Sequence, residues 1–293
     1  MRVLIVGCGY VGTEVGRLLA ADGHQVVGLR RTPAEEPPAA PAGVHLLTGD
    51  ITQPAELASL PGPFDWLINT VSSSRGGLAE YRQAYLGGTW NLITWLAGMK
   101  PRKYIYTSST SVYGQTDGSF VDETSPATPD SPTGQVLIET ERMLLEQARG
   151  GFPAVILRVA GIYGPGRGYL FQQYLRGQAR ITGAGNRFLN MIHRDDVAGA
   201  IVRGLDQGRP GQIYNVSDNE PVSELAFFQW LAEQLGRPLP PKADPAYRSA
   251  RKRGLTNKRV SNEKLRQQLG YSLKYPSFRE GYQQEIQGLK QRD

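Results

Sequence analysis

The sequence predicts an α/β protein built on a Rossmann-type, doubly wound parallel sheet, with a smaller C-terminal lobe. Three observations predict it. A glycine turn joins the first apolar run to the first helix, apolar runs alternate with helical patterns to about residue 160, and glycine-punctuated segments follow after residue 164. Repeated strand–helix alternation indicates a parallel sheet that is covered by helices on both faces.

The first strand is the apolar run 3–6, and the turn after it has the sequence Gly7-Cys8-Gly9-Tyr10-Val11-Gly12. The helix that follows has the apolar face Val11, Val15, Leu18 and Leu19. Glycine lets the backbone approach a ligand closely, and the free N–H groups and dipole of the helix face an anion. The turn therefore predicts a bound dinucleotide, with Gly7, Gly9, Tyr10, Val11 and Gly12 at its pyrophosphate. A tight turn without a ligand is the alternative.

The second strand, 25–30, ends in Arg30 and Arg31. An acidic residue at this place would accept the ribose hydroxyls of the adenosine. Two guanidinium groups stand there instead, and guanidinium pairs bidentately with phosphate. The pair favours NADP(H) over NAD(H); two solvated arginines at a strand end are the alternative.

The remaining elements follow from apolar runs and helical periodicity. Strands are predicted at 44–48, 66–69, 104–107 and 154–158, and helices at 78–96, 134–147 and 223–235. A last helix is expected to start within 260–265, capped by Ser261 or Asn262 and stopped at Gly270. We expect residues 1–164, with 190–216 returning to them, to form the dinucleotide-binding domain. Residues 165–189 and 217–293 would then form the smaller substrate lobe.

Length and composition are those of an ordinary globular chain: 293 residues, 40% hydrophobic and 20% charged. No run of 18 apolar residues predicts a membrane span. The single cysteine, Cys8, has no partner for an internal disulfide, which favours a reducing, cytoplasmic location. No metal site and no membrane partner are predicted.

The net charge of +6 is confined to one segment. Residues 241–266 hold nine basic residues against two acidic ones, whereas the rest of the chain holds 24 basic and 25 acidic residues. Because the excess is local, a general nucleic-acid-binding surface is not expected.

Several further stretches come in a characteristic order. They are Gly49-Asp50-Ile51, 104–114 (YIYTSSTSVYG), Leu157-Arg158, 162–166 (IYGPG), 192–198 (IHRDDVA) and Tyr214-Asn215-Val216. With the glycine turn, they make the chain resemble the extended short-chain dehydrogenases/reductases, also called the NAD-dependent epimerase/dehydratase family, over nearly its whole length.

The resemblance implies several cofactor-binding positions. Asp50 would take the adenine amino group with Ile51 beside the ring. Further cofactor positions would be Thr70, Val71, Ser72, Thr107 and Ala160. Ser109 matches the catalytic hydroxyl of the family, which hydrogen-bonds the substrate oxygen; a strand end capped by its own side chains is the alternative.

The family also carries a Tyr-x-x-x-Lys pair, in which the tyrosine transfers the proton and the lysine lowers its pKa. Here Thr133 stands at the tyrosine position and Leu137 at the lysine position. A threonine hydroxyl is far too weak an acid, and leucine carries no charge. The chain therefore resembles the atypical members that lack this pair.

Four residues are candidates for a substitute proton donor: Tyr113, Tyr163, His193 and Glu139. Each has a structural alternative. The tyrosines would pack with their hydroxyls bonded, His193 would order a loop with Asp195 and Asp196, and Glu139 would face solvent.

The basic segment also has two interpretations, a solvated face or an anionic nucleotide-sugar-like substrate held by Arg248, Arg251 and Arg253, with His193 nearby. We expect an NADP(H)-dependent oxidoreductase or epimerase-like enzyme acting on a small molecule, as a homodimer through the helices at 78–96 and 134–147. The alternative is a catalytically silent NADP(H)-binding sensor or regulator.

Overall fold

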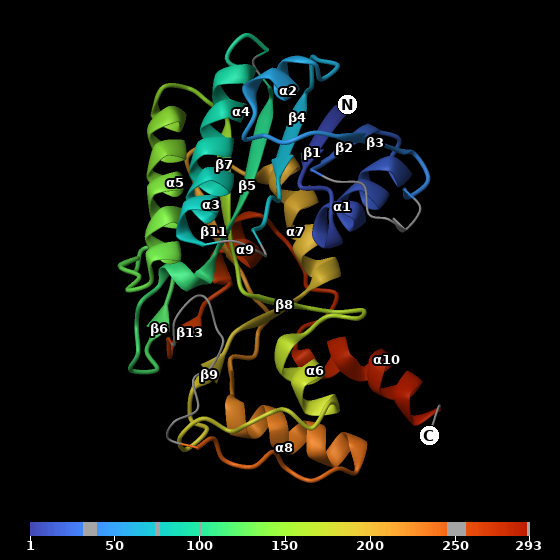
Figure 1. Cartoon of the computed structure of the whole chain (residues 1–293), viewed down its shortest axis with the longest axis vertical. Helices are drawn as coiled ribbons and strands as arrows, with labels where there is room; N and C mark the ends of the chain where they lie inside the picture. Colours follow the sequence, from blue (N-terminus) through green and yellow to red (C-terminus); the bar gives the residue numbers. More distant parts are fainter. Residues whose placement is uncertain (32–39, 74–76, 100, 245–255, 292–293) are drawn as a thin grey trace.

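A computed structural model describes residues 1–31, 40–73, 77–99, 101–244 and 256–291 of the chain. Its centre is a sheet of seven parallel strands in the order β11-β7-β5-β4-β1-β2-β3 (Figure 1). The strands are β1 (Arg2–Val6), β2 (Gln25–Arg30), β3 (Val44–Thr48), β4 (Trp66–Asn69), β5 (Lys103–Ser109), β7 (Ala154–Val159) and β11 (Ile213–Val216). The predicted Rossmann-type fold class is confirmed.

The strand order reverses at β1, which lies between β2 and β4 and is hydrogen-bonded to both. Chain connections leave β1 in opposite directions at this point, so a crevice opens beyond the carboxyl ends of the strands. Ligands of doubly wound sheets bind in that crevice. The glycine turn follows β1 directly and lies at its mouth.

Helices cover both faces of the sheet, because successive strand residues point to opposite sides. Leu4 and Val6 pack in one apolar cluster, and Val3 and Ile5 pack in the other. The first face carries α2 (Pro54–Ala58), α3 (Leu78–Arg82), α4 (Gly88–Leu96) and α5 (Pro132–Arg149). The second carries α1 (Tyr10–Ala21), α7 (Arg194–Gln207) and α9 (Glu263–Gln268).

The predicted helices form where the sequence placed them, with two differences. The segment 78–96 is interrupted by a π-helical turn, η1 (Gln83–Gly87), between α3 and α4. The last predicted helix starts after Asn262, whose side chain donates to Ser217 and Asn219 and does not cap the helix. The other expected cap, Ser261, accepts the N–H of Glu263 with its hydroxyl at 3.3 Å. Helix α5 starts at Pro132, after the N-cap Ser131, whose hydroxyl accepts the N–H of Gly134.

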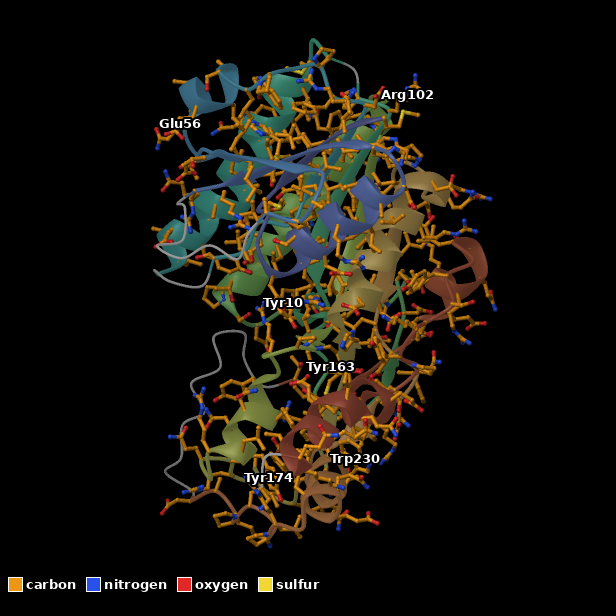
Figure 2. The ribbon with its side chains drawn as sticks, turned by 90° about the vertical axis from the view of Figure 1, so that its right-hand side faces the viewer. Tyr10, Glu56, Arg102, Tyr163, Tyr174 and Trp230 are labelled. Atoms are coloured by element: carbon orange, nitrogen blue, oxygen red, sulfur yellow. The ribbon has the colours of Figure 1, made fainter. Side chains whose placement is uncertain are left out.

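A smaller packed region lies below the carboxyl edge of the sheet (Figure 1). It has its own apolar cluster, which includes Phe171, Phe227 and Tyr282. Its main helices are α6 (Tyr169–Leu175), α8 (Glu224–Leu235) and α10 (Phe278–Lys290). In Figure 2, Tyr174 and Trp230 lie within this region, while Tyr10 and Tyr163 lie where it meets the sheet.

Three two-stranded ribbons connect the small region to the rest of the chain. Strand β8 (Gly161–Tyr163) pairs with β10 (Met191–His193), and β9 (Phe188–Leu189) pairs with β12 (Val222–Ser223). Strand β6 (Phe120–Val121) pairs with β13 (Arg259–Val260), which brings residues 259–260 of the basic segment beside the segment that follows β5. Within the described residues, no helix is long and apolar enough to span a bilayer.

Candidate functional site

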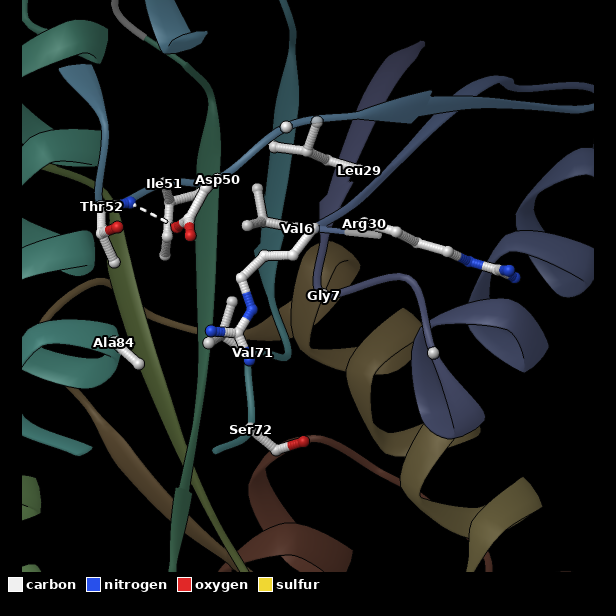
Figure 3. Close-up of a pocket in the computed structure, with 13 residues that line it drawn as sticks. Val6, Gly7, Leu29, Arg30, Asp50, Ile51, Thr52, Val71, Ser72 and Ala84 are labelled. Atoms are coloured by element: carbon white, nitrogen blue, oxygen red, sulfur yellow. Dashed lines mark hydrogen bonds between the residues drawn. The ribbon is translucent and has the colours of Figure 1, made fainter. Parts of the chain in front are cut away.

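A groove runs along the carboxyl edge of the sheet and contains two adjoining cavities. The first cavity, of about 230 Å³, is drawn in Figure 3 and lies between the glycine turn and the ends of β2 and β3. The second, of about 310 Å³, lies between the glycine turn and the ends of β5 and β7. Both are lined by Gly7, Gly9, Val71 and Ser72, so they form one continuous groove across the switch point.

The three glycines of the turn do different things. Gly7 has a φ of +81°, and a Cβ there would lie 2.7 Å from the backbone nitrogen of Val71, so only glycine is accommodated. A Cβ on Gly12 would press against the Gly7 carbonyl at 3.0 Å. A Cβ on Gly9 would meet only that carbonyl, at 3.8 Å. The backbone of Gly9 is therefore open to the groove, which a plain tight turn does not require.

The start of α1 also faces the groove with its backbone amides available. Gly9 is the N-cap, no side chain caps the first turn, and no acidic residue lies in that turn. Such a helix end carries unpaired N–H groups and a partial positive charge. The Thr70 hydroxyl lies 3.1 Å from the carbonyls of both Val6 and Gly7 and holds the turn in place. These residues can accommodate the pyrophosphate of a dinucleotide.

Arg30 and Arg31 both line the first cavity, but their side chains are held differently. Arg30 extends toward α1 in Figure 3, and its Nε donates to the Cys8 carbonyl at 2.5 Å. A second Arg30 nitrogen donates weakly to Thr13 at 3.4 Å. Arg31 lies 3.8 Å from Glu80 of α3 in an exposed ion pair. Because surface pairs of this kind contribute little, the Arg31 guanidinium is available to a phosphate.

Asp50 and Ile51 form the far wall of the first cavity (Figure 3). The Asp50 carboxylate accepts the N–H of Thr52 at 2.8 Å, which fixes the loop after β3. Ile51 is buried against α4, where a Cβ on Gly88 would overlap it. An apolar wall beside a carboxylate is suited to a purine ring with an exocyclic amine.

The second cavity brings together residues that lie far apart in the sequence. Its predicted members include Tyr10, Val11, Thr107, Ser109 and Ala160. Leu137 also lines it, so an apolar side chain occupies the place where a lysine was expected by resemblance. Of the cofactor positions predicted above, all except Gly12 line one of the two cavities.

A third cavity, of about 730 Å³, continues from the second into the small region. The two share Ser109, Ala160, Gly161, Ile162 and Arg167. Three basic side chains line the third cavity, Arg167, Arg187 and Lys258, and no acidic one does among the described residues. Sequence reasoning missed all three as site residues. Lys258 belongs to the basic segment, but its sequence context did not indicate that it is buried.

Tyr113 was expected at the catalytic centre, but the structure buries it in a polar network outside the three cavities. Its hydroxyl donates to Asn215 at 2.8 Å and accepts from Arg158 at 2.9 Å. Arg158 in turn forms a buried, bidentate ion pair with Glu141, which accepts from Ser108. The Tyr113 hydroxyl thus belongs to a buried hydrogen-bond network and does not face any of the three cavities.

The other proposed proton donors are also engaged. Glu139 pairs with Arg82 of α3, and this hydrogen bond holds its pKa below the usual range. His193 caps α7 by accepting the N–H of Asp195, and burial lowers its pKa to about 4. Tyr163 lines the third cavity, but its hydroxyl donates to the Ser277 carbonyl and burial raises its pKa. At neutral pH, Glu139 is charged and His193 is neutral, so neither holds an acidic proton.

Thr133 lies in the first turn of α5, half-buried, and lines none of the three cavities. His193, also expected near the substrate, likewise lies outside them. Arg248, Arg251 and Arg253 lie outside the described residues. Among the described residues, no cluster of histidine, cysteine and carboxylate side chains could hold a metal ion.

Comparisons with known proteins agree with this geometry. Residues 3–217 match the model of the NAD dependent epimerase/dehydratase family. The chain is 31% identical to Protein YeeZ of Escherichia coli over 282 residues, covering 94% of this chain and 96% of that protein. It is 26% identical to a 3-diazoavenalumate denitrifying reductase of a Streptomyces species, covering 97% and 100%. A solved structure of a functionally unknown conserved protein from Silicibacter pomeroyi is 31% identical, with a TM-score of 0.80 over 99% of both chains.

Proposed function

The chain belongs to the NAD-dependent epimerase/dehydratase family, and on this premise we propose that it is an NADP(H)-dependent oxidoreductase acting on a small molecule. One observation carries the proposal. A single open groove passes from Arg31 over Gly9 to Ser109 and from there into the third cavity. This arrangement offers one site for a dinucleotide and an adjoining site for a substrate.

In this proposal the bound nicotinamide supplies or accepts a hydride at the Ser109 end of the groove. The amides at the start of α1 hold the pyrophosphate, and Asp50 and Ile51 hold the adenine. Ser109 lines both the second and the third cavity and orients the substrate oxygen between them. The name of the Streptomyces relative, a reductase, supports the reductive direction.

The preference for NADP(H) rests on the two arginines that line the first cavity. A 2′-phosphate at the adenosine end would replace the weak pair between Arg31 and Glu80 with a charge-assisted bidentate contact. Arg30 would be less free to move, because its Nε is bonded to the Cys8 carbonyl.

The function is tested by NADPH oxidation against a panel of aldehydes, ketones, quinones and nucleotide sugars, with Ser109→Ala as the control. We expect turnover of at least one carbonyl and a loss of about 100-fold or more in Ser109→Ala. Binding of NADPH with no turnover over the whole panel would instead favour a redox sensor. Absence of NADPH binding would contradict the proposal.

We also propose a homodimer through α3, α4 and α5. Leu78 and Trp90 are large apolar residues on these helices, and each is about half exposed. Aromatic side chains such as that of Trp90 are typical of the buried centre of an interface. Light scattering should give twice the chain mass for the wild type and the monomer mass for Trp90→Glu; a monomeric wild type would contradict the interface.

A further inference from the structure

Lys258 is a buried lysine that lines the third cavity. Its position is set by segments far apart in the chain. Strand β13 follows it and pairs with β6, and Asn190 donates to its carbonyl at 2.9 Å. The preceding residue, Asn257, exchanges backbone hydrogen bonds with Gln115 and Gly118. The backbone at Lys258 is therefore fixed on both sides beside the loop that follows Ser109.

Among the described residues, two hydrogen-bond acceptors contact the ammonium of Lys258. Its Nζ donates to the Tyr113 carbonyl at 2.8 Å and to the Thr256 hydroxyl at 2.6 Å. An ammonium group has three donors, so one has no partner among the described residues. Both partners are neutral, and no ion pair among the described residues includes Lys258.

The charges around Lys258 are positive. Arg187 and Arg167 line the same cavity, and Arg187 is paired with the buried carboxylate of Glu224 at 2.9 Å. The neighbouring Arg259 points its guanidinium to the rings of Phe120 and Phe188. Burial, together with the charge of Arg187, lowers the pKa of Lys258 to about 8. Arg167 and Arg187 cannot serve as acids, because guanidinium does not lose its proton in proteins.

We propose that Lys258 is the proton donor for the substrate, in the place of the Tyr-x-x-x-Lys pair that this chain lacks. The proposal rests on the proposed reduction of a carbonyl group by NADPH. Lys258 is the residue before β13, whereas Leu137 comes from α5. The third cavity, which it lines, opens into the second at Ser109, where hydride transfer would occur.

The step balances with residues and cofactor as named. As the hydride of NADPH adds to the carbonyl carbon, the π pair of the C=O bond moves to the oxygen. An N–H bond of Lys258 breaks and its proton goes to that oxygen, which leaves an alcohol, NADP⁺ and a neutral amine. Water then returns a proton to the amine. An ammonium with a pKa near the working pH is suited to this exchange.

A test that needs no substrate is trace acetylation of the full-length chain with acetic anhydride between pH 6 and 11, followed by peptide mass spectrometry. Only the neutral amine reacts, so the labelling rate of each lysine reports its titration. We expect a labelling midpoint for Lys258 near pH 8. A midpoint above about pH 10, or no labelling in the folded chain, would overturn the proposal.

Turnover of the carbonyl found in the panel gives the second measurement. Lys258→Met should lower kcat about 100-fold or more, since general acids contribute on this scale. Activity of the wild type should fall as pH rises through about 8, because the ammonium is lost. Lys258→Arg keeps the positive charge, but it should lower kcat to the same extent and remove the fall in activity at about pH 8. Unchanged kcat and pH profile in either variant would overturn the proposal.

The matched control is Lys103→Met. Lys103 is partly buried and its ammonium donates to a carbonyl, that of Gly208. It is the first residue of β5 and therefore lies at the amino ends of the strands, away from the groove. Its variant should keep wild-type turnover. The melting temperature with and without NADPH separates the proposed function from the proposed proton donor. If NADPH does not raise the melting temperature of the wild type, the proposed function is contradicted. A normal NADPH shift combined with a high labelling midpoint for Lys258 contradicts the proton donor alone.

Discussion

The two ends of the groove are built in different ways. The first cavity is formed mainly by the turns that follow β1, β2, β3 and β4, each a short segment directly after its own strand. The third cavity is formed by residues from β5, β8 and β9 and from helices of the small region. These residues are spread over the sequence between Ser109 and Tyr282. Local sequence therefore specifies the first cavity, whereas the third depends on long-range packing and on buried polar contacts.

The largest effect is expected where long-range packing supports the third cavity. Arg158→Met removes one partner of the buried pair and leaves Glu141 with an uncompensated charge. We expect a loss of about 4 kcal/mol in the free energy of unfolding, measured by urea denaturation. The double variant Arg158→Met, Glu141→Leu should recover much of this loss. A single variant as stable as the wild type would show that the network does not hold the site.

A slightly smaller effect is expected at the turn of the first cavity. Gly7→Ala forces a Cβ into the backbone of Val71 and holds alanine at a φ of +81°. The strain and the overlap together should cost about 3 kcal/mol. Gly23, also at positive φ but with open space around it, is the matched control, and Gly23→Ala should cost only the strain. Equal losses in the two variants would contradict the close approach of Val71.

A pH-dependent effect is expected where the small region meets the sheet. His193 stays neutral in the folded chain to a pKa of about 4, whereas an unfolded histidine takes up a proton near pH 6.5. The unfolded state therefore binds more protons in this window, and stability falls as pH drops. Between pH 7 and 5 the wild type should lose about 2 kcal/mol more than His193→Asn. Parallel losses in both proteins would contradict the buried neutral imidazole.

The smallest predicted effect concerns cofactor choice in the first cavity. Arg31→Ala should weaken NADPH binding about 10-fold and leave NADH binding nearly unchanged, because only NADPH carries the 2′-phosphate. Arg30→Ala should show the same direction. Arg149→Ala removes an exposed arginine at the end of α5 and is the control. An equal loss for both cofactors in Arg31→Ala would contradict the phosphate contact.

The same contrast explains what could be predicted from sequence. The strand run 3–6, the turn Gly7 to Gly12 and the pair Arg30 and Arg31 are contiguous patterns. All the predicted cofactor positions except Gly12 line one groove. Tyr113 was a candidate proton donor for the site, but its partner Asn215 lies 102 residues away and holds its hydroxyl in the interior. Lys258 was missed for the same reason, since its burial depends on Tyr113, Asn190 and Thr256.

The most direct test of the central claim is calorimetric titration of NADPH into the wild type and Gly9→Ala. A Cβ at this position would make only an ordinary contact with the Gly7 carbonyl, at 3.8 Å, so alanine should not lower the melting temperature. Its methyl group would nevertheless stand where the pyrophosphate approaches the backbone. We predict NADPH binding to the wild type and an affinity about tenfold or more lower in Gly9→Ala at unchanged stability. Equal affinity in the two proteins, or no binding to either, would contradict the assignment of the groove to a dinucleotide.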